Sequence, residues 1–120
     1  MNVPAVTPFE AGLGRNAANH VPLSPLSFIR RTAAVYPDRP AIVHGELVRS
    51  WAETWARARR LASALAKRGR APGDVVAVMA PNIPAFVEAH FGIPLAGLVL
   101  NSLNIRLDAA TVRHNLEHGG

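Results

Sequence analysis

The chain has 120 residues, of which 49% are hydrophobic and 18% charged, and this composition is typical of a globular protein rather than a disordered one. It contains no cysteine, which excludes disulfides, thiolate nucleophiles and cysteine-type zinc sites and is consistent with a reducing, cytoplasmic location. Its net charge is +5, but the arginines are scattered along the chain, so we interpret the excess as ordinary surface charge rather than as a nucleic-acid-binding patch.

Residues 1–22 have none of the features of a signal peptide, and we expect them to form a flexible lead-in to an ordered part at residues 23–120. Ser24 followed by Pro25 predicts a helix start, because serine caps free backbone N–H groups and proline suits the first helical position. The helix should end before Pro37. Its apolar stripe is predicted to comprise Leu26, Ile29, Ala33 and Tyr36.

A β-hairpin is expected next. Residues 41–43 and 47–48 are short apolar runs of strand-forming residues, and residues 44–46 between them include a glycine suited to a tight turn.

The second helix has the clearest start signal in the chain. Ser50 and Glu53 have the spacing of a capping box, in which each side chain hydrogen-bonds the backbone N–H of the other residue. Gly69 is placed to end the helix in the left-handed conformation. The predicted inward stripe comprises Trp51, Trp55, Ala58, Ala62 and Leu65.

Residues 75–79 and 98–100 are continuously apolar, as strands covered on both faces would be. The helix between them should be capped by Asn82 and ended or kinked by Pro94. Two buried strands joined by a helix predict a parallel βαβ unit. The inward face of the connecting helix is predicted to comprise Ile83, Phe86, Val87, His90 and Phe91.

The remaining residues predict a polar turn at 101–104 and a last helix capped by Asp108, with Ala109, Val112 and Leu116 on one face. The fold class is therefore α/β, with a β-hairpin and a parallel βαβ unit flanked by helices. The most apolar stretch, residues 91–100, is too short for a membrane span, which needs about 20 residues.

Several phrases of this sequence, in this order and spacing, resemble the AMP-forming acyl-CoA synthetases, or adenylate-forming ligases. The similarity extends from about residue 23 to residue 118. Arg49 departs from the pattern, since the family often has an aromatic residue there, and this should alter a strand-end contact rather than the chemistry. The phrases are PDRPAIV at 37–43, SWAE at 50–53, RLASAL at 60–65, GDVVAV at 73–78, APNIP at 80–84, EAHFGIP at 88–94 and LNSLNIRL at 100–107.

This resemblance implies the N-terminal part of a large adenylation domain, and residues 80–107 are most similar to ligases for fatty acids and related short or medium-chain acids. Such enzymes join a carboxylic acid to ATP and pass the acyl group to coenzyme A, so ATP, Mg²⁺, coenzyme A and the acid are the expected ligands of a full-length member. Full-length members are several times longer, so we expect this chain to be truncated and inactive alone.

The catalytic motifs of that family have no counterpart here. ATP activation requires a Gly/Ser/Thr-rich loop with a lysine, which holds the phosphates through backbone N–H groups and charge. The glycines are isolated apart from Gly119 and Gly120, and the only lysine, Lys67, lies in a predicted helix. We therefore assign no catalytic, cofactor-binding or metal-binding residue to these 120 residues.

One short motif resembles a metal site. His114, Glu117 and His118 fit the pattern H-x-x-E-H, and two histidines four residues apart share a helix face. A catalytic zinc ion needs a third protein ligand, which could come only from upstream residues. We interpret the motif as the polar face of an amphipathic helix.

Other residues with possible chemistry also have simpler interpretations. Trp51 and Trp55 could stack on a ligand, but we interpret them as core residues, and we interpret His90 as a packed histidine rather than a catalyst. Asn101 and Asn104 follow a strand, where α/β proteins place ligands, yet they also suit a turn. The basic residues interpreted as a solvated helix face rather than as phosphate contacts are Arg57, Arg60, Lys67 and Arg68.

Two alternatives to the ligase portion stay open. A non-catalytic binding module derived from the same family would expose a long apolar face for a partner chain. A nucleic-acid-binding protein would show steeply salt-dependent DNA binding, in keeping with the basic pI of about 11.3.

Overall fold

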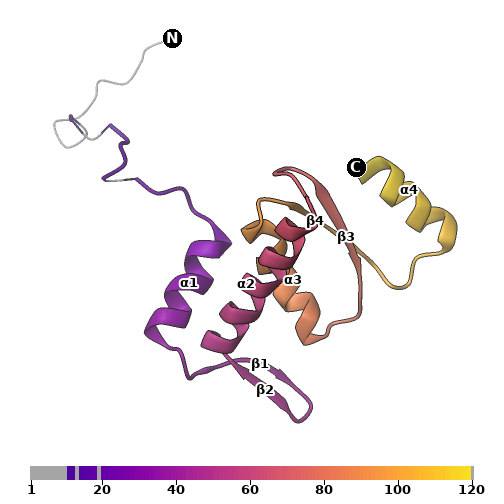
Figure 1. The fold of residues 1–120 in the computed structure, drawn as a ribbon, viewed down its shortest axis with the longest axis horizontal. Coiled ribbons are helices and arrows are strands. Elements are labelled where there is room, and N and C mark those ends of the chain that lie inside the picture. The colour runs from indigo at the N-terminus through magenta and orange to yellow at the C-terminus, as the bar shows by residue number, and fades with distance from the viewer. Residues whose placement is uncertain (1–10, 13, 19, 120) are drawn as a thin grey trace.

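The computed structural model describes residues 11–12, 14–18 and 20–119 and has the predicted α/β architecture (Figure 1). Of the predicted lead-in at 1–22, residues 1–10, 13 and 19 lie outside the described residues. A first helix and a hairpin are followed by alternating helices and strands, and all eight predicted elements are present. They are α1 Pro25–Val35, β1 Pro40–His44, β2 Leu47–Ser50, α2 Trp51–Lys67, β3 Val75–Met79, α3 Pro84–Leu95, β4 Val99–Leu103 and α4 Ala109–Gly119.

The helix starts follow the capping chemistry of the sequence. Ser24 Oγ accepts a hydrogen bond from the N–H of Leu26 at 3.2 Å, with Pro25 at the first position of α1. Ser50 and Glu53 form both bonds of the capping box at the start of α2. These local signals therefore place both helix starts correctly.

The buried stripes of α1 and α2 are narrower than predicted. In α1, Ile29 and Ala33 are buried, whereas Tyr36 is the C-cap and is 53% exposed. In α2 the buried residues include Thr54, whose hydroxyl donates to the backbone oxygen of Ser50 at 2.8 Å. Because that bond satisfies its only donor, a polar side chain can occupy the interior.

The hairpin and the βαβ unit are both confirmed. β1 and β2 pair antiparallel around a two-residue turn at Gly45 and Glu46. β3 and β4 pair parallel, with Val75 opposite Val99 and Met79 opposite Leu103, and α3 connects them. These two strands form a sheet separate from the hairpin.

The core lies on one face of the β3–β4 sheet, where α2 and α3 cover it. Ala89, Ile93 and Leu98 form the buried cluster, and Val76 and Leu100 pack against it from the strands. Side chains alternate along a strand, so Val78 shares the face of Val76, whereas Ala77 and Met79 point to the other face. The hydrophobic side chains that pack against the cluster are Leu61, Leu65, Val76, Val78, Ala96 and Leu100.

The predicted inward face of α3 is wrong. Ile83, not Asn82, is the N-cap, and it makes no side-chain cap bond. Val87 is 39% exposed and His90 is exposed as well. The buried residues of α3 are Pro84, Glu88, Ala89, Gly92 and Ile93. Because α3 is apolar on nearly all sides, its spacing does not select one face.

The second strand of the pair is longer than predicted. Asn101, Ser102 and Leu103 continue β4, and the turn begins only at Asn104. Asn101 lies opposite Ala77 in the parallel ladder, so the prediction of a turn at 101–104 is wrong for its first three residues.

The second face of the sheet is only partly covered in the described chain, where Leu103 at the end of β4 is buried but its neighbours are not. Met79 and Val99 are 47% and 51% exposed, and Ala77 is exposed too. α4 lies beyond this face, so the sheet separates it from α2 and α3 (Figure 1). No residue of α4 within the described range is buried, and Leu116 is 45% exposed. The apolar sequence of these strands predicts cover on both faces, and within the described residues only the face toward α2 and α3 packs against a buried cluster.

Asp108, the predicted cap of α4, makes the stability of that helix depend on pH. Hydrogen bonds from the backbone N–H and the hydroxyl of Thr111 lower the pKa of Asp108 below its ordinary value. Because the pKa of Asp108 is lower in the folded protein than in the unfolded chain, where it is about 3.9, the ionised carboxylate stabilises the helix at pH values above about 3.9. This stabilisation is lost as the pH falls through the pKa of the folded state. We expect the protection of the α4 amides, measured relative to the intrinsic exchange rate at each pH, to fall below about pH 4. Asp108→Asn should retain a cap and lose this dependence, and equal pH profiles of the two proteins would contradict the assignment.

Candidate functional site

The carboxyl ends of β3 and β4 open into a cavity of about 570 Å³. Open α/β sheets place ligands at this edge, so this cavity is the candidate site. One wall is the β3–α3 loop with Phe86 of α3, and the other is the end of β4 with the turn after it. The lining residues are Ala80, Pro81, Asn82, Phe86, Ser102, Leu103, Asn104, Ile105 and Arg106.

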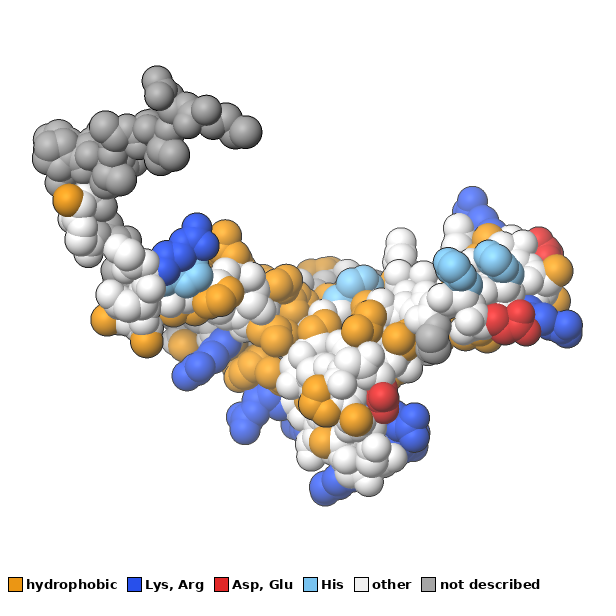
Figure 2. All heavy atoms as spheres, turned by 90° about the horizontal axis from the view of Figure 1, so that it is seen from above, with side chains coloured by type: hydrophobic (Ala, Val, Ile, Leu, Met, Phe, Trp, Pro, Cys, Tyr) orange, Lys and Arg blue, Asp and Glu red, His pale blue; other side chains and the backbone are white. Residues whose placement is uncertain are grey.

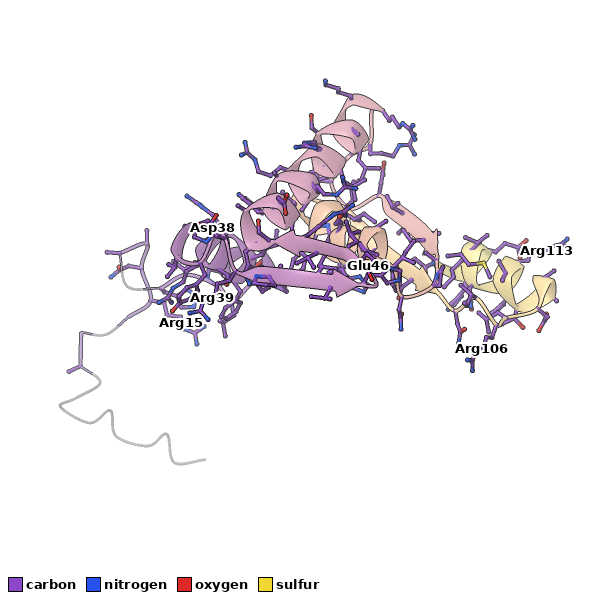
Figure 3. The ribbon with its side chains drawn as sticks, turned by 90° about the horizontal axis from the view of Figure 1, so that it is seen from below. Arg15, Asp38, Arg39, Glu46, Arg106 and Arg113 are labelled. Atoms are coloured by element: carbon purple, nitrogen blue, oxygen red, sulfur yellow. The ribbon has the colours of Figure 1, made fainter. Side chains whose placement is uncertain are left out.

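The turn after β4 shapes the polar wall of the cavity. Asn104 Oδ1 accepts a hydrogen bond from the N–H of Arg106 at 2.9 Å, which holds the turn closed. The Arg106 side chain extends away from the ribbon and is exposed (Figure 3). Because the guanidinium of Arg106 reaches solvent, it contributes only a weak positive potential at the cavity mouth. It does not form a buried pocket for an anion.

The described lining of the cavity offers a small set of polar groups. Its polar groups are the amides of Asn82 and Asn104, the hydroxyl of Ser102 and the guanidinium of Arg106. Among these described lining residues there is no carboxylate, imidazole or amine that could serve as a general acid or base. The cavity also lacks the carboxylate ligands that Mg²⁺ prefers, so these residues do not fit a Mg²⁺–ATP site.

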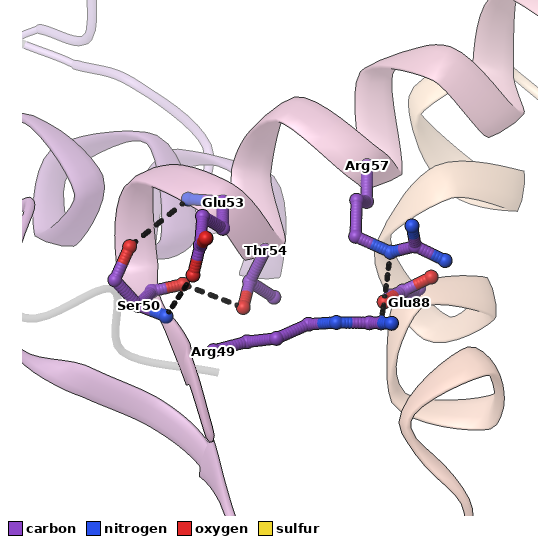
Figure 4. A network of polar contacts seen from close by, with 6 residues as sticks. All are labelled: Arg49, Ser50, Glu53, Thr54, Arg57 and Glu88. Carbon is purple, nitrogen blue, oxygen red and sulfur yellow. Dashed lines mark hydrogen bonds and ion pairs between the residues drawn. The ribbon is translucent and has the colours of Figure 1, made fainter. Parts of the chain in front are cut away.

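A cluster of charges lies away from this cavity, where β2, α2 and α3 meet (Figure 4). Arg49 Nη1 and Arg57 Nε both donate to Oε1 of Glu88, the latter at 2.6 Å. The Glu88 side chain is only 7% exposed, whereas the side chains of Arg49 and Arg57 are 19% and 40% exposed. The bond to Glu88 raises the pKa of Arg57 above its ordinary value.

This cluster corrects the interpretation of Arg57 as a solvated residue and shows what Arg49 contacts. Arg57 does not belong to a purely solvated face, because it is held by Glu88, while Arg60, Lys67 and Arg68 are exposed. Arg49, the departure from the family pattern, makes its contact with Glu88 at the end of β2. Spacing along the chain does not predict this cluster, because Glu88 is 39 residues from Arg49 and 31 from Arg57. A charged residue in an otherwise apolar helix was the one available signal.

The histidine motif forms a stacked pair on the exposed surface of α4. The rings of His114 and His118 lie 5.6 Å apart between centroids, with an angle of 7° between their planes. Within the described residues no group of three His, Cys, Asp or Glu side chains is arranged to hold a metal ion. The structure therefore brings two of the required ligands together and supplies no third from the described chain.

The other candidates are distributed over separate places. Trp51 lines an apolar hollow of about 430 Å³ between α1 and α3, together with Phe28 and Phe91, and Trp55 is half-buried. His90 is exposed and does not face the core as predicted, but its ring packs edge-on against that of Phe86, with centroids 4.8 Å apart and its Nδ1 2.7 Å from the backbone oxygen of Phe86.

The two asparagines have different surroundings. Asn104 lines the candidate cavity and also forms its turn, so both interpretations apply to it. Asn101 lies within β4 and does not line that cavity. Its Nδ2 donates to the backbone oxygen of Asn115 in α4 at 3.3 Å, which ties the helix to the sheet.

Comparison with known proteins gives consistent matches. Residues 29–120 match the family described as AMP-binding enzyme. The chain is 54% identical over 101 residues to the peroxisomal acetate/butyrate–CoA ligase AAE7 of Arabidopsis thaliana, covering 84% of this chain and 18% of that protein. It thus spans about a fifth of the length of the curated relatives it matches.

Solved structures have the same fold. A Rhodopseudomonas palustris protein assigned as a long-chain-fatty-acid CoA ligase is 33% identical with a TM-score of 0.74, over 78% of this chain and 24% of that one. The o-succinylbenzoate–CoA synthetase of Bacillus subtilis, solved with ATP and magnesium ion, is 26% identical with a TM-score of 0.73, over 78% and 26%. In the described residues, no helix combines the length and apolar character that a bilayer-spanning segment requires.

Proposed function

The chain belongs to the AMP-binding enzyme family, and from this membership we propose that it is the N-terminal portion of an ATP-dependent acyl-CoA ligase. The observation that carries the proposal is the family match over residues 29–120, supported by 54% identity to an acetate/butyrate–CoA ligase. The reaction is the joining of a carboxylic acid to ATP, followed by transfer of the acyl group to coenzyme A. The substrate class is a short or medium-chain carboxylic acid.

In this proposal residues 23–120 form part of the AMP-binding domain, after a flexible lead-in at 1–22. They supply a scaffold of helices around a parallel strand pair and no catalytic, cofactor-binding or metal-binding residue. The cavity at the strand ends supports this division, because its described lining offers neither a carboxylate for Mg²⁺ nor a glycine-rich loop for phosphates. ATP, Mg²⁺ and coenzyme A would be held by other parts of a full-length ligase, and these 120 residues would be inactive alone.

A chimera tests the proposal. The segment of the Arabidopsis acetate/butyrate–CoA ligase that matches this chain is replaced by the corresponding residues of this chain. We expect the chimera to form acyl-CoA from butyrate, ATP and coenzyme A, whereas the same ligase lacking the segment should be inactive. A folded, monodisperse chimera that forms no acyl-CoA would contradict the proposal.

The alternative is a non-catalytic interaction module derived from the same family. The exposed residues Met79 and Val99 on the second sheet face favour it, because such a module needs an apolar surface for its partner. It predicts that the 120-residue chain co-purifies with a ligase chain and that the chimera stays inactive.

We also propose a cytoplasmic location, supported by the absence of cysteine. The name of the Arabidopsis relative includes a peroxisomal location, which is the competing possibility. Fluorescence microscopy of the tagged chain in its native cell distinguishes a diffuse from a punctate distribution.

A further inference from the structure

A second hollow, of about 480 Å³, lies between α2, α3 and the inner face of β3, and we call it the α2–α3 groove. It shares no lining residue with the candidate cavity, so the two are separate places on the molecule. Its apolar walls include Leu61 and Leu65 of α2, Val76 and Val78 of β3, and Ile93 of α3. Apart from Ile93 these side chains are only partly buried, so the groove presents apolar surface to the solvent.

The groove has a charged end and an apolar end. Near the first, Arg57 of α2 meets Glu88 of α3. At the other, Leu65 packs with Ile93 in the core cluster. Arg57 and Leu65 are eight residues apart on one helix, which separates the two ends by about 12 Å. An elongated groove with this polarity suits a molecule that has one charged head and one medium-length alkyl chain.

The charged end carries an excess of positive charge. Three arginines, Arg49, Arg57 and Arg60, lie there with a single carboxylate, that of Glu88, which gives a net charge of +2. Arg49 and Arg57 both donate to the same oxygen of Glu88, whereas Arg60 has no ion-pair partner among the described residues. In the view of Figure 2, Lys and Arg side chains likewise project beside hydrophobic surface, and carboxylates are few. The head that complements this end of the groove is therefore an anion.

We propose that the α2–α3 groove binds a single-chain anionic amphiphile, with its alkyl chain against Leu61, Leu65 and Val78 and its head at Arg60. A guanidinium binds carboxylate and phosphate alike through two parallel hydrogen bonds, so the head is a carboxylate, as in a fatty acid, or a phosphate, as in an alkyl phosphate. Arg60 is exposed, which leaves its guanidinium free to turn toward such a head. The site goes beyond the proposed function, because neither the ligase reaction nor the candidate cavity uses it.

The alkyl chain is tested by isothermal titration calorimetry of the 120-residue chain with hexanoate, octanoate and decanoate, each below its micelle concentration. We expect one saturable site whose affinity rises about fourfold for every two methylene groups, because an open groove removes only part of the chain from water. Uptake of several molecules per protein without saturation, or an affinity that does not depend on chain length, would overturn the proposal.

The head is tested with the same alkyl chain on different charges. We expect decanoate, decyl phosphate or both to bind at least about tenfold more tightly than decyltrimethylammonium, whose cationic head has no partner at Arg60. The tighter of the two anions identifies the head as carboxylate or phosphate. Equal binding of the cationic amphiphile would overturn the proposal.

Three variants locate the site. Arg60→Gln should weaken decanoate binding at least about fivefold, whereas Arg59→Gln, the matched control, should bind as the parent chain does, because Arg59 is exposed on α2 and does not line the groove. Ala64 is exposed and lines the groove, so Ala64→Phe should fill it and abolish binding while circular dichroism shows a retained fold. Equal affinities of the two arginine variants, or undiminished binding by Ala64→Phe, would place the ligand elsewhere and overturn the proposal.

Discussion

Replacing Arg49 and Arg57 together with methionine is expected to destabilise the fold by about 3–5 kcal/mol, because the Glu88 carboxylate is then buried without a partner. The Glu88 side chain is 7% exposed, and both arginines donate to the same oxygen. The hairpin and the two central helices meet at this carboxylate (Figure 4). The measurement is the free energy of unfolding from urea denaturation at neutral pH.

The matched control removes the buried charge as well. Adding Glu88→Met to the double variant should restore most of the lost stability, because well-packed apolar residues replace buried ion pairs with little net cost. A loss below about 1 kcal/mol in the double variant would mean that Glu88 reaches water and that the cluster contributes as a surface ion pair does. If the double variant is unfolded in buffer, the same comparison is made in the ligase chimera.

Gly92→Val is expected to destabilise the protein by about 3 kcal/mol, at the upper end of the cost of overpacking. Gly92 is buried where α3 crosses α2. A Cβ there would lie 2.8 Å from Cδ2 of Leu61 and 2.9 Å from the backbone oxygen of Ala58. The side chain of Leu61 can rotate away, but the oxygen of Ala58 is part of the backbone of α2 and cannot. The valine side chain therefore forces α2 and α3 apart.

Ala66→Val is the matched control for this substitution. Ala66 is exposed on α2, so valine there reports only its lower helix propensity, about a few tenths of a kcal/mol. Equal losses of unfolding free energy at the two positions would show that the helices can separate freely at Gly92. A large loss at Gly92 alone would confirm that the α2–α3 crossing requires glycine.

The parts of the fold that the sequence predicts well depend on local chemistry. Ser24, Ser50 and Asp108 each have a side-chain oxygen next to the free N–H groups of a helix, and all three caps are present. The parallel pairing follows from strand, helix and strand in that order and is also confirmed. Such signals need only a few neighbouring residues.

The parts that the sequence does not predict depend on distant neighbours. Helix α3 is apolar on most sides, so only its contacts with α2 and the sheet decide that Glu88 is buried and His90 exposed. Asn101 and Ser102 are polar and suggest a turn, yet they continue β4, because Asn101 bonds to α4 and Ser102 remains exposed. The candidate cavity forms only when the ends of both strands meet.

We propose that these 120 residues form part of the adenylation scaffold and that the groups that hold the phosphates of ATP lie elsewhere in a full-length ligase. The most direct test incubates the purified 120-residue chain with ATP, Mg²⁺, butyrate and coenzyme A and measures pyrophosphate release and acyl-adenylate, with the chimera as the positive control. We expect no product above the protein-free blank from the 120-residue chain, and turnover by the chimera. Acyl-adenylate formed by the chain alone would contradict it.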